Sequence, residues 1–148
     1  MIEDIINGIA AKLKDLFPQK NIYDENIEQG YEEPCFFIIY EDDDESRFPG
    51  NRYGIELHFR IIYFQDFSKR NNDLYSTRNI LKLEFQYIEY KNFKYRITEK
   101  HFEKQDKDLH FTFTIKVQMK NKNDNENSFS DIDIAEERKE KWIRKKKK

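Results

Sequence analysis

Alternating apolar and polar residues near residue 110 give the clearest structural signal in the chain. From Leu109 to Met119 every second residue is apolar, and the residues between them are His, Thr, Lys and Gln. A period of two predicts a strand with one buried face. The same alternation predicts strands from Ile55 to Tyr63 and from Phe93 to Ile97.

Apolar residues at three- and four-residue spacings predict two helices. The first spans residues 2–17, with acids in its first turn, and Pro18 ends it. The second begins among the capping residues Ser68 to Asn72 and runs to about Tyr87. Its apolar face is expected to comprise Leu74, Thr77, Leu81, Phe85 and Ile88.

Three further segments complete the predicted fold. Ile22 to Glu28 is a short strand candidate, and the wholly apolar run from Cys35 to Tyr40 is typical of a central strand. Charged residues and chain breakers from Asp42 to Asn51 predict the protruding tip of a hairpin. The order of elements predicts a single α+β domain, with a mainly antiparallel sheet of four to five strands and two helices packed on one face.

Composition separates this domain, residues 1–120, from the end of the chain. The 148 residues suit one domain, and 16% aromatic residues favour an ordered core despite 38% charged residues. Residues 121–130 are almost wholly polar and predict a linker. Residues 131–148 form a C-terminal arm with a strongly basic end, for which a helix and a disordered segment are both open interpretations.

The formal net charge of −2 predicts no strong attraction to nucleic acid from the chain as a whole. The single cysteine, Cys35, excludes an intrachain disulfide. The acidic N-terminus does not suit a secretory signal, and the longest apolar run is too short to span a bilayer. We therefore expect a soluble protein made in the cytoplasm, with no membrane partner.

The sequence contains no recognisable catalytic or metal-binding motif. His58, His101 and His110 lie on three different predicted strands, without the spacing of a local zinc motif. The acids from Asp42 to Glu45 lack the alternating ligands of a calcium loop, and the scattered glycines form no phosphate loop. The prediction is a non-enzymatic protein with no metal and no cofactor.

Three short motifs carry a family resemblance. They are Glu28-Gln29-Gly30, Glu33-Pro34-Cys35-Phe36-Phe37-Ile38 and Gly50-Asn51-Arg52-Tyr53, and they follow the N-terminal amphipathic helix in that order. Over residues 1–120 the chain resembles the tail terminator family of phages and prophages of Gram-positive bacteria. The acidic run from Glu41 to Glu45 and the lysine-rich arm depart from that pattern.

The resemblance implies a structural protein of the virion, made in the host bacterial cytoplasm and located where tail meets neck. Proteins of this family form a ring, typically of six copies, that caps the tail tube, stops its polymerisation and offers a surface to the head. The implied partners are further copies of the chain, the tail tube protein, and sheath and head-completion or neck proteins. The implied fold is the same α+β domain.

A ring needs two different, complementary patches on each subunit. The residues we select as interface candidates are the charged or exposed ones at the predicted hairpin tip and in the basic arm: Asp42, Asp43, Asp44, Glu45, Arg47, Phe48, Arg144, Lys145, Lys146, Lys147 and Lys148. Two alternatives stay open, namely another neck or head-completion connector and a small nucleic-acid-binding protein that uses the basic tail.

Overall fold

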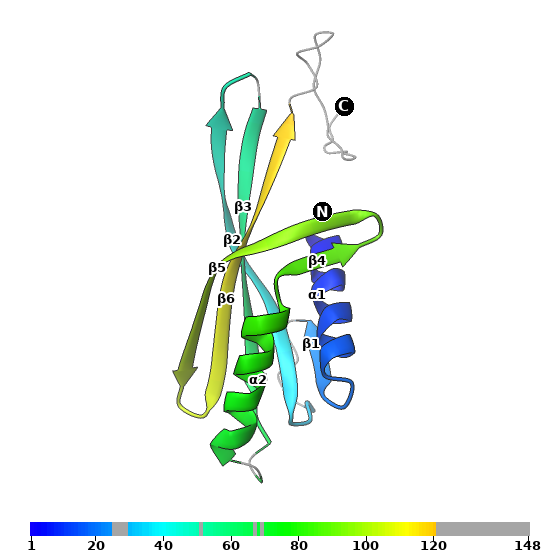
Figure 1. The fold of residues 1–148 in the computed structure, drawn as a ribbon, viewed down its shortest axis with the longest axis vertical. Helices are drawn as coiled ribbons and strands as arrows, with labels where there is room; N and C mark the ends of the chain where they lie inside the picture. The colour runs from blue at the N-terminus through cyan, green and yellow to red at the C-terminus, as the bar shows by residue number, and fades with distance from the viewer. Residues whose placement is uncertain (25–29, 51, 67, 69, 121–148) are drawn as a thin grey trace. The chain divides into compact units, whose positions relative to one another are not determined.

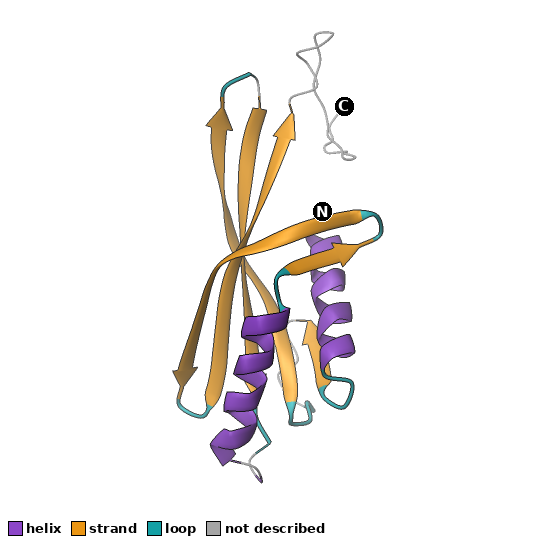
Figure 2. Ribbon diagram, viewed as in Figure 1, coloured by secondary structure: helices purple, strands orange, loops and turns teal. Residues whose placement is uncertain are grey.

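A computed structural model describes residues 1–24, 30–50, 52–66, 68 and 70–120 (Figure 1). Along the chain the elements are α1 (Ile2–Leu16), β1 (Asn21–Asp24), β2 (Cys35–Phe48), β3 (Arg52–Phe64), α2 (Arg70–Glu84), β4 (Tyr87–Tyr90), β5 (Phe93–Gln105) and β6 (Asp108–Lys120). The predicted α+β class with two helices is confirmed (Figure 2).

The sheet has six strands in the order β1-β2-β3-β6-β5-β4 and is mixed, where we expected four to five mainly antiparallel strands. β1 runs parallel to the start of β2, pairing Asn21–Asp24 with Cys35–Ile38, whereas β4–β5 and β5–β6 are antiparallel. We did not predict β4, because a strand of four residues is too short to show a clear alternation of apolar and polar residues. The direction of β1 depends on where the following segment carries the chain, which no local pattern encodes.

The described residues divide into two compact units. One contains Asp44–Glu56 with Met1 and the end of β6 from Val117, and the other contains Ile2–Asp43 and Leu57–Lys116. Both helices and the strands β1, β4 and β5 belong to the second unit.

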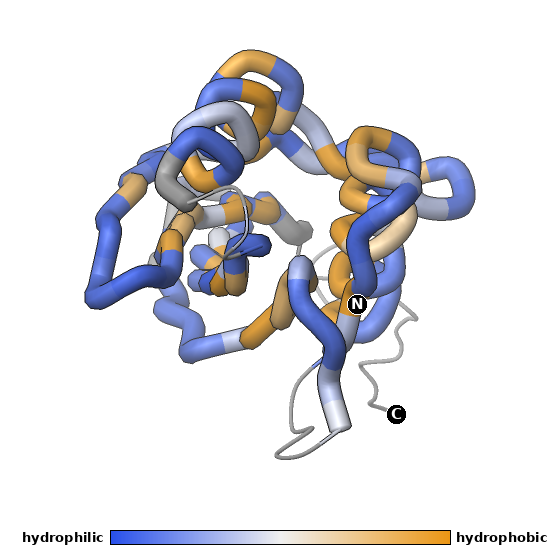
Figure 3. Tube along the Cα trace, turned by 90° about the horizontal axis from the view of Figure 1, so that it is seen from below, coloured by the Kyte–Doolittle hydropathy of each residue, from blue (hydrophilic) through white to orange (hydrophobic). Residues whose placement is uncertain are grey.

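In the second unit, α1 contacts β1 and β4, the two strands at opposite ends of the sheet order. The sheet therefore curls so that both of its outer strands meet one helix. Gly8 makes the approach to β4 possible, because a β-carbon at this position would come within 2.6 Å of Ile88 Cγ2. Figure 3 shows hydrophobic and hydrophilic residues side by side in both helices, as their amphipathic patterns require.

The core lies between the helices and one face of the sheet. β3 and β6 contribute alternate residues that are at most 2% exposed, namely Leu57, Phe59, Ile61, Tyr63, Leu109, Phe111, Phe113 and Ile115. Phe17, just after α1, packs on Phe36, and Phe85, just after α2, packs on Phe111 and Phe113. The register predicted from alternation in β6 is confirmed from Leu109 to Ile115, whereas Val117 is only half-buried.

The predicted helices differ from the observed ones mainly at their ends. α1 matches the expected span, and every residue of the expected face of the second helix is buried. α2 ends at Glu84, however, so Phe85 lies beyond the helix and Ile88 lies in β4. The buried residues thus keep a helical spacing beyond the end of α2 by coincidence, although Ile88 already lies in β4.

A bulge in β5 connects the sheet to the end of α2. The pairing with β6 shifts between Thr98 and His101, and Glu99 adopts a positive φ of 53°. Lys100, in the bulge, donates hydrogen bonds to the carbonyl oxygens of Lys82 at 3.2 Å and of Phe85 at 3.5 Å. A cation at the C-terminal end of a helix satisfies carbonyls that lack helical partners.

Candidate functional site

The acidic residues that were expected in a loop instead lie on strand β2. β2 extends to Phe48, so the turn begins only at Pro49 and Gly50, where Gly50 has a φ of 78°. We call residues 41–45 the acidic stretch; all five are exposed. Our prediction of a loop was wrong here because β2 continues beyond Cys35–Ile38, the part that pairs with β1, and a strand can carry consecutive charges on an exposed surface. Such charges also discourage unwanted strand pairing.

Three side chains of the acidic stretch interact with neighbouring groups in the second unit. Arg60 Nε donates a hydrogen bond of 2.5 Å to Glu41, and His58 Nε2 lies 4.0 Å from Asp42. Tyr40 donates a hydrogen bond to Asp43, and burial together with this bond raises the pKa of Tyr40 to about 12. These contacts hold three of its side chains against neighbouring residues, and the acidic stretch still presents a strongly negative exposed surface.

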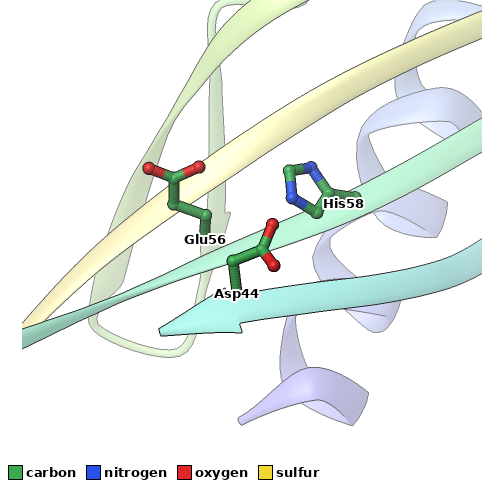
Figure 4. A group of neighbouring side chains, drawn as sticks. All are labelled: Asp44, Glu56 and His58. Atoms are coloured by element: carbon green, nitrogen blue, oxygen red, sulfur yellow. The ribbon is translucent and has the colours of Figure 1, made fainter. Parts of the chain in front are cut away.

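Asp44 and Glu56, on β2 and β3, bring carboxylate oxygens within 4.8 Å of each other, and Figure 4 draws them with His58. Glu56 and His58 are two residues apart on β3, so they share a face of that strand. His58 belongs to the second unit, where its Nδ1 lies 3.0 Å from Thr114 Oγ1. Two carboxylates alone do not define a cation site, and we assign no metal to this group.

The remaining interface candidates divide between the end of β2 and the end of the chain. Arg47 is exposed on β2, next to Phe48, which ends the strand. The five basic residues from Arg144 to Lys148 lie outside the described residues.

Polar side chains form a cross-strand row on the sheet that sequence reasoning missed. Thr114 of β6 is 3% exposed, and its hydroxyl donates to Glu99 of β5 at 3.5 Å. Lys116 Nζ lies 3.0 Å from Glu99 and lowers the pKa of that carboxyl group. Only the register of β5 against β6 brings these residues together, so no pattern along the chain predicts the contact.

Arg60 of β3 and His110 of β6 form a second cross-strand contact, between neighbouring strands of the sheet. Arg60 Nη1 lies 2.9 Å from His110 Nδ1 and can only donate, so this nitrogen must accept the hydrogen bond. Burial and the neighbouring guanidinium lower the pKa of His110. The imidazole is therefore neutral near pH 7 and acts as a structural acceptor.

Among the residues that the structure describes, the most buried ion pair, Lys20–Asp73, belongs to a cluster that joins α2 to β3 and to the chain after α1. Lys20 Nζ donates to Tyr63 at 2.7 Å, to Thr77 at 2.8 Å and to Asp73 at 3.1 Å, and Tyr63 donates to Asp73. Burial alone would raise the pKa of Asp73, but hydrogen bonds from Tyr63, the Asp66 amide and Lys20 lower it. Burial and Asp73 raise the pKa of Tyr63.

Asp73 and Tyr63 are both held in the charge state that they have in water near pH 7, the carboxyl group ionised and the phenol neutral. General acid–base catalysis needs a group whose pKa lies close to the working pH. The cluster therefore positions α2 on the sheet, and neither Asp73 nor Tyr63 is poised for proton transfer. Cys35 is similar, because burial raises the pKa of its thiol to about 12 and keeps it protonated.

A groove lies between α1 and the β4–β5 hairpin, with a volume of about 470 Å³. Its walls are Gly8, Ala11, Lys12 and Asp15 from the helix and Tyr87, Glu89 and Lys94 from the hairpin. Helical periodicity places the four α1 residues along one stripe, but their opposition to the hairpin arises only in the folded chain.

Most of the chain matches a protein-family model. A family model described as "Phage tail terminator protein" matches residues 4–127, which include all six strands and nearly all of α1. No curated protein matches the chain. Among the described residues, neither helix is long and apolar enough to cross a membrane.

Proposed function

The chain belongs to the phage tail terminator protein family and is a structural protein of the phage tail; from this premise we propose that it forms a ring that caps the tail tube. In this proposal the ring, most simply a hexamer, binds the last ring of tube protein and stops polymerisation. Its other face then receives neck or head-completion proteins. The observation that carries the proposal is the family match over residues 4–127.

A cap of this kind acts by binding other proteins and catalyses no reaction. It therefore needs contact surfaces on each subunit. A closed ring uses two different patches on each subunit, which contact each other around the ring. The acidic stretch supplies one exposed, strongly negative surface. The sequence Arg144 to Lys148 supplies five positive charges at the end of the same chain, and their attraction supports the pairing of neighbouring subunits.

A tube-capping assay tests this function directly. Tail tube protein is polymerised with and without the purified chain, and tube lengths and ends are examined by electron microscopy. We expect shorter tubes that carry a ring of additional density at one end, and mass photometry should give the number of subunits in that ring. Tube ends that remain open and continue to grow at saturating protein would contradict the proposal.

The same preparations distinguish the alternative functions. A neck connector should bind completed heads and leave tube growth unchanged. A nucleic-acid-binding protein should bind DNA with an affinity that falls steeply with salt, because each phosphate contact releases counterions.

A further inference from the structure

The groove between α1 and the β4–β5 hairpin has room for an aromatic side chain. Gly8 and Ala11 leave its helix side low, and Tyr87, which is 41% exposed, lies on the hairpin side. Its volume of about 470 Å³ falls within the range of small ligand sites. The residues that line the groove all belong to the second compact unit, so its shape depends on that unit alone.

The charged groups that line this groove leave room for further partners. Lys94 Nζ lies 4.4 Å from the centre of the Tyr87 ring and 4.0 Å from Glu89. Lys12 and Asp15 form no ion pair with any residue that the structure describes. A phenol ring that enters the groove meets an aromatic ring and two cations, and its hydroxyl can donate to a carboxylate. The groove therefore suits a tyrosine flanked by acidic residues.

The segment from Tyr31 to Glu33, which we call the tyrosine segment, has this composition. Tyr31 is 36% exposed, and Glu32 and Glu33 are exposed beside it. Within the described part of the chain, the Tyr31 hydroxyl has no hydrogen-bond partner and neither glutamate forms an ion pair. The tyrosine segment thus offers one phenol and two negative charges, which complement the carboxylates and the two lysines of the groove.

Internal contacts hold the tyrosine segment in place. The centre of the Tyr31 ring lies 5.4 Å from the ring centres of both Phe37 and Phe64. The amide of Glu32 donates a hydrogen bond of 3.2 Å to the hydroxyl of Tyr23 in β1. A segment that is already ordered loses little conformational entropy when it binds.

The groove and the tyrosine segment are two different surfaces of one unit. The tyrosine segment is bonded to β1 and the groove is walled by β4, and these strands lie at opposite ends of the sheet order. Tyr31 does not line the groove of its own chain. Two different, complementary patches on each copy produce head-to-tail association, which closes into a ring when the rotation between copies allows it.

We propose that the groove of each subunit binds the tyrosine segment of a neighbouring subunit. This contact rests on the proposed ring and identifies one place where two of its subunits meet. In it the exposed part of the Tyr31 ring contacts Tyr87, its hydroxyl donates to Asp15, and the two glutamates face the lysines of the groove.

Cysteine cross-linking between two variants tests this contact. Ala11→Cys and Tyr31→Cys proteins are mixed and treated with a short thiol cross-linker, to which the buried Cys35 is not accessible. We expect a cross-linked dimer in the mixture and none in either protein alone, because a head-to-tail contact brings these positions together only across different copies. Asn7→Cys replaces Ala11→Cys in the control, since Asn7 is exposed on the same helix and does not line the groove.

A mixture without cross-linked dimer, or an equal yield with the Asn7→Cys control, would refute the proposal. The outcome is also distinct from that of the capping assay. Capping of tail tubes without cross-linking would overturn this contact and leave the proposed function standing. Cross-linking without capping would support the contact and contradict the proposed function.

Complementation of two defective variants provides an independent test. Ala11→Arg fills the groove and Tyr31→Ala removes the ring, so neither protein alone should form oligomers in analytical ultracentrifugation. An equal mixture should form dimers and nothing larger, because one protein keeps the tyrosine segment and the other keeps the groove. Dimers in the mixture also show that both variants are folded. Rings formed by either variant alone would refute the proposal.

Discussion

Gly8 of α1 and Ile88 of β4 lie so close together that a β-carbon on Gly8 would come within 2.6 Å of Ile88 Cγ2 and 3.2 Å of the Glu89 carbonyl oxygen. This approach lets one helix pack against the last strand of the sheet. Because Cγ2 belongs to a β-branched side chain and the oxygen belongs to the backbone, neither can yield easily.

Gly8→Ala is therefore expected to destabilise the fold. Alanine gains up to about 1 kcal/mol of helix propensity over glycine, but overpacking at a closed contact costs about 1–3 kcal/mol. Denaturant midpoints measure the balance. Asn7→Ala, on the exposed side of the same helix, should be neutral or slightly stabilising. A Gly8→Ala protein as stable as the unmodified one would mean that the helix is not held so close to β4.

Asp73→Asn tests the buried cluster through its pH dependence. The folded pKa of Asp73 lies below its ordinary value of 3.8, so the carboxylate contributes stability above that value and loses it as the pH falls through the folded pKa. Asp73→Asn should be less stable than the unmodified protein at pH 7, by roughly 1–3 kcal/mol for loss of buried charge-assisted bonds. The difference should shrink below pH 3.8. Urea midpoints that differ equally at pH 7 and pH 3 would contradict this account.

Phe113→Ala should be among the most damaging substitutions in the core. Phe113 is 2% exposed and its ring contacts those of Phe59, Phe85 and Phe111 at centroid distances of 5.7, 5.6 and 5.0 Å. Loss of a buried phenylalanine ring costs about 3–5 kcal/mol. Thr112→Ala, one residue away on the other face of β6, should cost much less. Thermal melts of the two variants that coincide would contradict the assigned register.

Neutralising the acidic stretch should weaken assembly more than stability. Asp42→Asn with Asp43→Asn removes two exposed charges that make only surface contacts, so the free energy of unfolding should change by no more than about 1 kcal/mol. Subunit association, measured by mass photometry at low salt, should fall. Glu84→Gln with Glu103→Gln removes two exposed charges elsewhere and should leave association unchanged.

Salt provides a second test of the same surface. Raising the ionic strength of the unmodified protein should reproduce the loss seen in the double variant, because the Debye length shortens to about 3 Å at 1 M salt. Association that is equally strong in both double variants and in high salt would remove the acidic stretch from the interface.

The sequence by itself determined the elements whose side chains follow a regular period over many residues. β3, β6 and α1 were predictable because each buries one face, and the period of that face depends only on local geometry. The family resemblance in the first half of the chain also came from local motifs, and the matched family model confirms it. These features can be predicted without knowing which other elements pack against them.

Tertiary structure alone decided which residues meet. The parallel pairing of β1 with β2 and the packing of α1 on β4 join segments that lie apart along the chain. So do the cluster around Lys20, whose partners lie 43 to 57 residues away, and the groove between α1 and β4. Hydrogen bonds and close contacts between distant residues have no period along the sequence, so only the folded chain reveals them.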